Sequence, residues 1–456
     1  MNMENTNSKK VNQITEGVIW KQLLLFFFPI LFGTFFQQLY NAADAMIVGR
    51  FVGKEALSAV GGSTGTLINL LVGFFIGLGS GATVIISQYY GAKRSEMVEY
   101  AVHTAMAFCV VAGIFLTVCG VIGAPYALRA MNTPEEVLSG ATVYIRIYFV
   151  GTVGNLIYNM GSGILRAVGD SKRPLYFLIA GCLINIVLDV VLVVFLNLGV
   201  AGAAAATILS QALSAVLVIV TLMRTEDMHR LVLRCIRIDT RMLGRIIRIG
   251  FPTGLQSVMY SSSNVLIQAA VNSLGTDTVA AWTAYSKIDC VFWMIVNAFG
   301  ISVTTFAGQN FGAGKVDRVR RGTRVSWLMT AGTTVVLSLV LYYFGPVTYR
   351  LFATDETVIA IGTDILRYLV PTYFTYITIE ILSGALRGVG DCWIPTLICL
   401  VGICLLRVVW LMTAVPMRRE IHTIVFSYPL TWVTTSILFI VYYLVFSKMG
   451  LLRKEK

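Results

Sequence analysis

The sequence has little charge and few histidines. Only 13% of its 456 residues are charged, against about 25% in a typical soluble domain, and there are 3 histidines. Its 8 cysteines show neither a CxxC pair nor the Cys/His spacing of a zinc site, so no disulfide framework and no metal site are predicted. No HExxH motif or His/Asp/Ser arrangement stands out. The chain is therefore not predicted to be an enzyme.

Long hydrophobic runs take the place of the missing charge. Hydrophobic residues make up 57% of the sequence. Runs such as 22–40 and 175–196 are close in length to the about 20 residues that a helix needs to cross a bilayer. Backbone groups in lipid must bond within their own segment, so these runs are expected to be helices. We predict an all-α membrane protein with twelve transmembrane helices, centred on residues 22–46, 60–86, 98–122, 141–164, 174–196, 201–222, 246–270, 280–305, 323–345, 361–385, 393–415 and 423–447.

The net charge of +12 predicts a topology rather than a nucleic-acid partner. With twelve spans, most lysines and arginines fall on the side that holds both termini, and this side is cytoplasmic by the positive-inside rule. We expect a multi-pass protein of the inner (plasma) membrane. The predicted divisions are a cytoplasmic tail over 1–18, an N-lobe over 19–222, a basic linker helix over 223–245, a C-lobe over 246–447 and a cytoplasmic tail over 448–456.

The predicted linker helix is rich in arginine. Its arginines and those that follow recur every three or four residues, which places them on one helix face: Arg230, Arg234, Arg237, Arg241, Arg245 and Arg248. One interpretation is a helix that lies on anionic lipid headgroups. The other, which we favour, is a solvated connection that only satisfies the positive-inside rule.

The two halves of the chain share sequence. Leu165-Arg-Ala-Val-Gly-Asp170 recurs as Leu386-Arg-Gly-Val-Gly-Asp391, and Gln88-Tyr-Tyr-Gly-Ala92 recurs as Gln309-Asn-Phe-Gly-Ala313, both at an offset of 221 residues. Because each half has six spans, both halves enter the membrane in the same direction, and a pseudo-two-fold axis along the membrane normal relates the two lobes. Transporters built in this way bind the substrate between the lobes and alternate access to it by rocking. In the first block Arg166 is positioned to pair with Asp170, and the block is interpreted mainly as a capping loop.

Two carboxylates lie within the predicted spans of the first half. Asp189 follows Asn185 by one helical turn, and Asp44, Asn159 and Thr207 lie on other spans of the same half. Ionised side chains are costly in a bilayer and typically mark an ion or proton path. Because neighbouring carboxylates do not both ionise easily, the set predicts binding of a proton, or of Na⁺ through the same oxygens. No other cofactor is expected.

The second half lacks these acids at the equivalent positions. Its own acids are Asp289 and Glu380, and Glu380 is expected either to act as a counter-ion for a cationic substrate or to be neutralised by Arg407. Pro29 precedes Asp44 on the first span and is a candidate hinge. The candidate substrate-cavity residues are Tyr40, Gln38, Tyr260, Asn264, Tyr285, Asp289, Trp293, Tyr376 and Glu380.

These features together resemble the multidrug and toxic compound extrusion (MATE) family, in its prokaryotic DinF/MepA-like branch. The resemblance rests on the twelve-span duplication, on Ala42-Ala43-Asp44 followed by Val48-Gly49, and on the repeated blocks quoted above. It implies an exporter of small organic, often cationic molecules that exchanges them for H⁺ or Na⁺. It further implies bending of the first helix at Pro29 and a cation-coupling cluster of Asp44, Asn159, Asn185, Asp189 and Thr207, with Tyr144 as an additional member.

Alternatives to an exporter are a lipid-linked oligosaccharide flippase of the same superfamily, an intramembrane enzyme and a channel. A flippase cavity is expected to be strongly basic, whereas the charges within these spans are mainly acidic. A channel needs no protonation cycle. The expected partners are small organic substrates and membrane lipids, and the chain is expected to act as a monomer.

Overall fold

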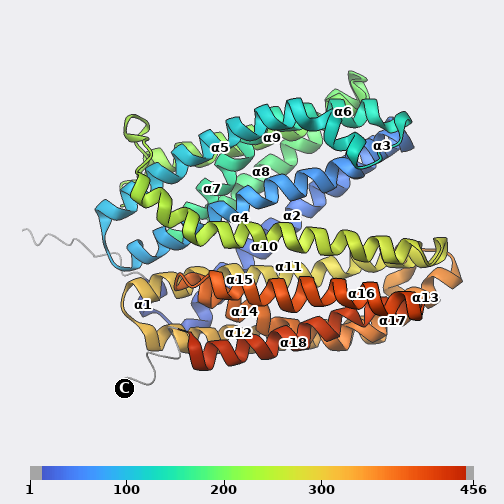
Figure 1. Cartoon of the computed structure of the whole chain (residues 1–456). Coiled ribbons are helices and arrows are strands. Elements are labelled where there is room, and N and C mark those ends of the chain that lie inside the picture. Colours follow the sequence, from blue (N-terminus) through green and yellow to red (C-terminus); the bar gives the residue numbers. More distant parts are fainter. Residues whose placement is uncertain (1–12, 448–456) are drawn as a thin grey trace, which may run out of the picture.

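The computed structural model describes residues 13–447, and every regular element in this range is helical. The helices form two bundles that lie close together at one end and diverge toward the other (Figure 1). The predicted tails lie largely outside the described residues, because 1–12 and 448–456 are not described. Within the first tail the short helix α1 (Gln13–Glu16) precedes the first long helix.

The N-lobe is the bundle formed by the first half of the chain. Its elements are α2 (Ile19–Phe51), α3 (Lys54–Gly61), α4 (Ser63–Gly91), α5 (Ser95–Ala130), α6 (Glu135–Val150), α7 (Thr152–Val168), α8 (Lys172–Asp189), the π-helix η1 (Val190–Phe195) and α9 (Gly199–Arg224).

The C-lobe is the bundle formed by the second half. Its elements are α10 (Thr240–Asn272), α11 (Thr276–Gly312), α12 (Val316–Arg350), α13 (Glu356–Leu369), η3 (Val370–Thr372), α14 (Tyr373–Gly388), α15 (Trp393–Cys399), the π-helix η4 (Leu400–Leu405), α16 (Leu406–Met417), α17 (Ile421–Val425), α18 (Ser427–Val441) and η5 (Tyr442–Phe446).

The predicted all-α fold with its membrane spans is confirmed. Among the described residues, 10 helices are long and apolar enough to cross a membrane, and the pair α6 and α7, bent by 49° at Gly151, makes up to 11. The remaining predicted span is α10, which has 33 residues but is more polar. Its polarity has a structural reason, because Gln256, Ser257 and Asn264 face a cavity.

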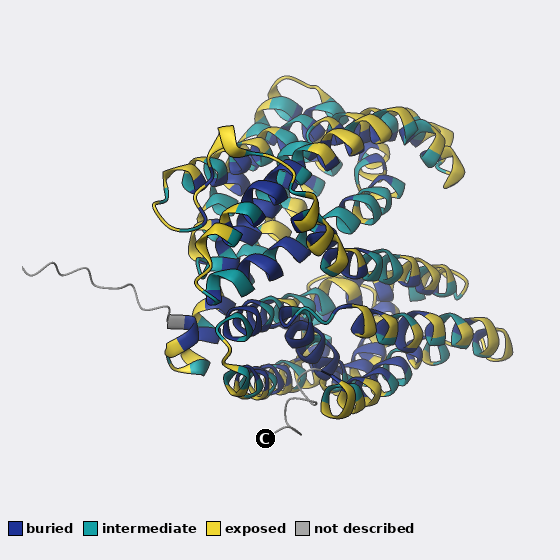
Figure 2. Ribbon diagram, turned by 60° about the vertical axis from the view of Figure 1, so that its left-hand side comes forward, coloured by how far each residue is buried: buried dark blue, intermediate teal, exposed yellow. Residues whose placement is uncertain are grey.

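The outer faces of both bundles are apolar. Figure 2 shows exposed residues on the outside of the bundles and buried residues between the helices. Phe115 and Ile122 on α5 and Leu328 and Tyr343 on α12 are large hydrophobic side chains in these exposed positions. Apolar surface of this extent marks contact with another apolar phase, and on long helices that phase is lipid.

Two helices pack on both lobes. The first half of α2 contributes Leu23 and Phe27 to a core with Phe299 of the C-lobe, and the Phe27 and Phe299 rings stack with 4.1 Å between centroids. The second half of α2 contributes Val48 to an N-lobe core. Helix α10, the first helix of the C-lobe, packs in the opposite sense: Ile246 in its first part belongs to an N-lobe core, and Ile267 in its second part belongs to a C-lobe core. Each lobe therefore holds one end of the other lobe's first helix.

The connection between the lobes differs from the prediction. No single basic helix spans 223–245, because α9 ends at Arg224, a short 3₁₀ helix η2 covers Leu233–Cys235, and α10 begins at Thr240. The segment docks on α5 instead, where the Val232 backbone N–H donates to His103 Nε2 (3.0 Å) and that of Asp239 donates to Thr104 Oγ1 (3.2 Å). Asp239 then caps α10 by accepting from the Met242 N–H (2.7 Å). These fixed partners replace the helical hydrogen bonds.

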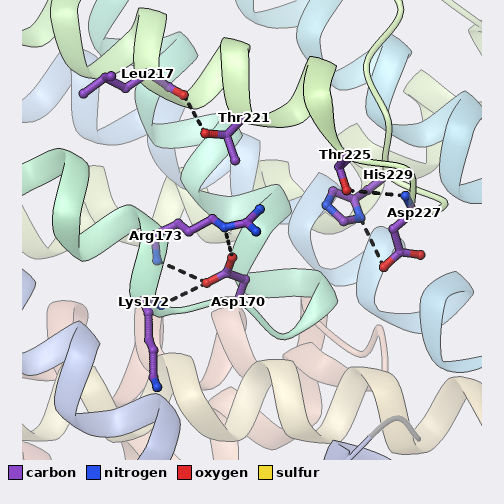
Figure 3. A network of polar contacts seen from close by, with 8 residues as sticks. All are labelled: Asp170, Lys172, Arg173, Leu217, Thr221, Thr225, Asp227 and His229. Atoms are coloured by element: carbon purple, nitrogen blue, oxygen red, sulfur yellow. Dashed lines mark hydrogen bonds and ion pairs between the residues drawn. The ribbon is translucent and has the colours of Figure 1, made fainter. Parts of the chain in front are cut away.

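The loop after α7 is a helix cap, as interpreted from the sequence. Gly169 adopts φ 110° at the end of α7, and Asp170 accepts the backbone N–H groups of Lys172 and Arg173 at 3.1 Å (Figure 3). The expected pairing of Arg166 with Asp170 does not form. Asp170 pairs with Arg173 at 3.2 Å instead, because that side chain lies on the helix that Asp170 caps.

Candidate functional site

The two N-lobe acids lie close together in a buried position. Asp44 on α2 has 7% of its surface exposed and Asp189 at the end of α8 has 0%. Their carboxyl groups are near enough to interact electrostatically, and Tyr144 of α6 lies near both. Helices α2 and α8 pack against each other, and this packing brings together residues that are far apart in the sequence.

The polar atoms of this cluster have few hydrogen-bond partners. Both oxygens of Asp189, Oδ1 of Asp44 and both amide atoms of Asn185 have no partner among the described residues. An ionised carboxylate buried without a donor costs several kcal/mol. The arrangement is therefore stabilised when a proton or a small cation occupies it, and this is the chemistry that the sequence predicts for these residues.

The backbone changes its hydrogen-bond pattern at Asp189. The α-helix α8 ends there and continues as the π-helix η1. Single π-helical turns within α-helices occur frequently at functional sites. The C-lobe also contains two π-helices, η4 and η5, but both lie at different positions in the repeat. The irregularity beside Asp189 therefore belongs to the N-lobe alone.

The other proposed members of the cluster lie in different surroundings. Thr207 on α9 is buried and donates to the Ala203 carbonyl at 3.1 Å. The Asn159 amide donates to the backbone carbonyl and the side-chain oxygen of Asn155, both at 2.9 Å, and Asn159 lines a cavity between the lobes. Its hydrogen bonds thus do not connect it to either acid.

The C-lobe encloses a cavity of about 610 Å³. Most of the substrate-cavity candidates line it, namely Tyr260, Asn264, Tyr285, Asp289, Trp293, Tyr376 and Glu380. The cavity is rich in aromatic rings that contact one another edge to face, with 4.7 Å between the centroids of Trp293 and Tyr376 and 5.5 Å between those of Tyr376 and Trp432. Such a wall suits a flat or cationic organic molecule.

The acids of this cavity have hydrogen-bond donors, unlike those of the N-lobe. Asp289 accepts from the Tyr373 hydroxyl and the Trp293 indole N–H, each at 2.6 Å. Tyr373 was not predicted from the sequence, where nothing distinguishes it from other aromatic residues. Glu380 accepts from the Tyr376 hydroxyl at 3.4 Å.

Two expected members of the substrate cavity lie elsewhere, and one expected neutralising pair is absent. Gln38 donates to Cys290 Sγ at 2.9 Å, and Tyr40 lies near Asp44 in the N-lobe. Arg407 does not neutralise Glu380, because its guanidinium lies over the Tyr428 ring and donates to Thr431 at 3.3 Å. The arginine that interacts electrostatically with Glu380 is Arg387.

The lobes meet through a reciprocal pair of hydrogen bonds, which we call the glutamine latch and define by Gln88 and Gln309. Gln88 Nε2 donates to the Gly388 carbonyl at 2.8 Å, and Gln309 Nε2 donates to the Ala167 carbonyl at 2.6 Å. The two donors, Gln88 and Gln309, are separated by the 221-residue offset of the internal repeat, and the two acceptors, Ala167 and Gly388, are separated by the same offset. Both glutamines belong to the block that is repeated in the sequence, but their pairing across the lobes was not predicted from it.

Small residues permit this close approach. A Cβ atom at Gly91 would overlap the Gln309 carbonyl oxygen, and one at Gly312 would overlap that of Gln88. Farther along α4, Gly77 and Gly81 similarly contact the backbone of α10 at Gly254 and Gly250. Small residues let membrane helices pack backbone to backbone. The end of the molecule at the α9–α10 connection is therefore tightly closed.

Two six-span lobes around a central region lined by polar and aromatic side chains define a membrane transporter of the parallel-repeat type. The MatE family model matches residues 29–191 and again residues 252–413, once in each lobe. The chain belongs to the MatE family. Members of this family are transporters, so this chain is a multi-pass membrane transporter and not an enzyme.

Known relatives and solved structures match nearly the whole chain. The probable multidrug resistance protein YoeA of Bacillus subtilis is 31% identical over 387 residues, covering 83% of each chain. YpnP of the same organism, also a probable multidrug resistance protein, is 28% identical, covering 84% of this chain and 85% of its own. The outward-facing structure of a multidrug resistance MATE transporter of the MOP superfamily superposes with a TM-score of 0.89 at 21% identity, covering 98% of both chains.

Proposed function

We propose that this chain exports small organic molecules, many of them cationic, in exchange for H⁺ or Na⁺. The family and the relatives named multidrug resistance proteins support multidrug efflux. The observation that carries the coupling is the pair of buried carboxyls, Asp44 and Asp189, whose oxygens largely lack protein partners. An oligosaccharide flippase is not favoured, because the relatives YoeA and YpnP are both named for drug resistance.

The coupling cation binds in the N-lobe in this proposal. Asp44, Asp189 and Asn185 supply the oxygens, and Tyr144, Thr207 and Asn159 support the cluster from neighbouring helices. The path to the substrate is α2, because Asp44 lies in its second half while its first half packs on the C-lobe. Pro29 lies in the first half of α2, between Phe27, which stacks on the C-lobe, and Asp44, and its missing backbone hydrogen bond makes bending easier there. Occupation of the carboxyls thereby shifts the lobes against each other.

The substrate binds mainly in the C-lobe cavity. Its aromatic rings attract a cation through their faces, and Asp289 and Glu380 supply carboxyl groups in a lining that also holds Arg387 and Arg407. No cofactor other than the coupling ion is involved, and the chain acts as a monomer in contact with lipid. We place the protein in the plasma membrane with both termini and the closed, latched end in the cytoplasm, because the basic residues gather on that side.

Gradient-driven flux in proteoliposomes tests this function. The purified protein is reconstituted, a fluorescent cationic dye is placed inside, and an inward gradient of H⁺, of Na⁺ or of neither is imposed. We expect one of the two gradients to accelerate efflux of the dye well beyond the rate without a gradient. Efflux that is equally fast without any gradient would contradict exchange and would favour a channel.

A further inference from the structure

Two arginines at equivalent positions of the repeat line one cavity between the lobes. Arg166 lies in the last turn of α7 in the N-lobe and Arg387 in the last turn of α14 in the C-lobe, one repeat offset apart. Both line a cavity of about 400 Å³ whose other walls come from α4, α10 and α11. The function proposed above assigns them no role.

Neither guanidinium has a hydrogen bond or an ion pair among residues 13–447. The nearby acids of the two repeated blocks are engaged elsewhere, because Asp170 pairs with Arg173 at 3.2 Å and Asp391 accepts from the Tyr442 hydroxyl at 2.6 Å. Arginine donates through five N–H groups in a fixed fork. Two such forks are therefore available to a ligand in this cavity.

The charge in this cavity is positive. Glu380 is the acidic side chain among its lining residues, which also include the two arginines. Glu380 interacts electrostatically with Arg387, whereas Arg166 interacts with Tyr158. The positive charge of Arg166 is thus not balanced by an acid of the cavity. In this region of low dielectric, the attraction between an anion and a guanidinium group is stronger than in water.

This cavity joins the aromatic cavity of the C-lobe. Ser257, Glu380 and Arg387 line both spaces, whereas Arg166 lines only the cavity between the lobes. A molecule whose rings contact Trp293 and Tyr376 therefore reaches Glu380 and Arg387 where the two cavities join, and Arg166 beyond that point. An amphoteric aromatic compound matches this order of groups, with its cationic part near the acids and its anionic part at the arginines.

We propose that Arg166 and Arg387 form a binding site for the carboxylate or phosphate group of an exported aromatic compound. This inference rests on the proposed export function and adds a substrate class to it, since a purely cationic substrate leaves the site unused. Arginine is the side chain best suited to these planar or multidentate anions, because its fork matches their oxygens.

The site also depends on the conformation of the transporter. The carbonyls that the glutamine latch holds belong to Ala167 and Gly388, each directly after one of the arginines. When the lobes separate at this end, Arg166 moves with the N-lobe and Arg387 with the C-lobe. An anion that contacts both guanidinium groups therefore favours the latched conformation.

Rhodamine B and its ethyl ester test the site, because the two dyes differ mainly by a free carboxylate. Binding to the purified protein is followed by fluorescence polarisation for the wild type, Arg166→Gln, Arg387→Gln and Arg166→Lys. Arg367→Gln is the matched control, because Arg367 is exposed on α13 and lines neither cavity. Benzoate and phenyl phosphate compete with rhodamine B, and the stronger competitor identifies the preferred anion.

We expect each glutamine variant to raise the Kd of rhodamine B, relative to the Kd of the ester on the same variant, about tenfold or more. Arg166→Lys retains part of the affinity, and the control behaves as the wild type. An equal loss for both dyes, an unchanged Kd for rhodamine B, or competition by neither anion overturns the site. Gradient-driven transport of the ester by the wild type tests the export function separately, because the ester lacks the carboxylate.

Discussion

Removing one side of the glutamine latch is expected to loosen both sides. Gln309 is fully buried, and its Nε2 donates to the Ala167 carbonyl at 2.6 Å; Gln88 makes the equivalent bond to the Gly388 carbonyl at 2.8 Å. Alanine at either position removes one hydrogen bond and leaves a carbonyl without its partner, which costs about 1–3 kcal/mol. Because each bond joins the two lobes, this cost falls on the latched conformation and spares the separated one.

The size of the expected effect follows from that free energy. A change of about 1–3 kcal/mol shifts an equilibrium between two conformations about 5- to 150-fold. Hydrogen–deuterium exchange measures this shift at the two loops that carry the acceptors, residues 165–171 and 386–392. Exchange through lobe separation then speeds up by the same factor in both loops, whichever glutamine is replaced.

The non-local response is the decisive part of this prediction. Gln256→Ala is the matched control, since Gln256 Nε2 donates to Cys399 Sγ at 3.2 Å within the C-lobe and makes no bond between the lobes. It is expected to leave exchange in both loops unchanged. If Gln88→Ala speeds exchange only in residues 386–392, or Gln309→Ala only in residues 165–171, the bonds are local and do not hold the lobes together.

Two further predictions concern the same end of the molecule. Gly91→Ala is expected to lower the melting temperature of the purified protein, because the added Cβ overlaps the Gln309 carbonyl. The control is Gly332→Ala, at a helix position with open space around it, which leaves the melting temperature equal or higher. An equal decrease in melting temperature for both variants would contradict the close packing at Gly91. Burial lowers the pKa of His229 below its ordinary 6.5, while Asp227 and Asp170 act in the opposite direction and Arg173 in the same one. The folded state thus favours neutral His229, so stability is retained above about pH 6.5 and falls as the pH drops below it. Melting curves at pH 7.5 and 5.5 check this prediction. If the melting temperature of a His229→Gln variant decreases between these two pH values as much as that of the wild type, the prediction is refuted.

The transmembrane architecture was predictable because hydropathy and the repeat gave independent signals. Helix α10 shows the value of the second signal, since its hydropathy alone does not mark it as a span. It was predicted over 246–270 together with the other spans, within the observed Thr240–Asn272, and the repeat of six spans in each half supports it. The bend of 49° at Gly151 was not predicted, because the sequence there remains apolar.

The errors arose where tertiary partners decide the local structure. The arginine spacing around 230–248 indicated one helix, but His103 and Thr104 of α5 bind the backbone of the segment in an extended form. Arg166 was assigned to Asp170 because they are four residues apart, whereas Asp170 binds the helix that it caps. The glutamine latch joins residues 300 and 142 positions apart, a distance over which a single sequence gives no pairing information.

Asymmetry between the lobes is the central feature of the proposed mechanism. The unpartnered acids are in the N-lobe, whereas Asp289 and Glu380 of the C-lobe accept hydrogen bonds from aromatic side chains. The most direct test compares Asp189→Asn with Glu380→Gln for gradient-driven efflux of a cationic dye from proteoliposomes. We predict that Asp189→Asn abolishes the response to the cation gradient, while Glu380→Gln keeps the response and binds the dye more weakly. A gradient response that survives Asp189→Asn and disappears in Glu380→Gln would place the coupling in the C-lobe and contradict the account.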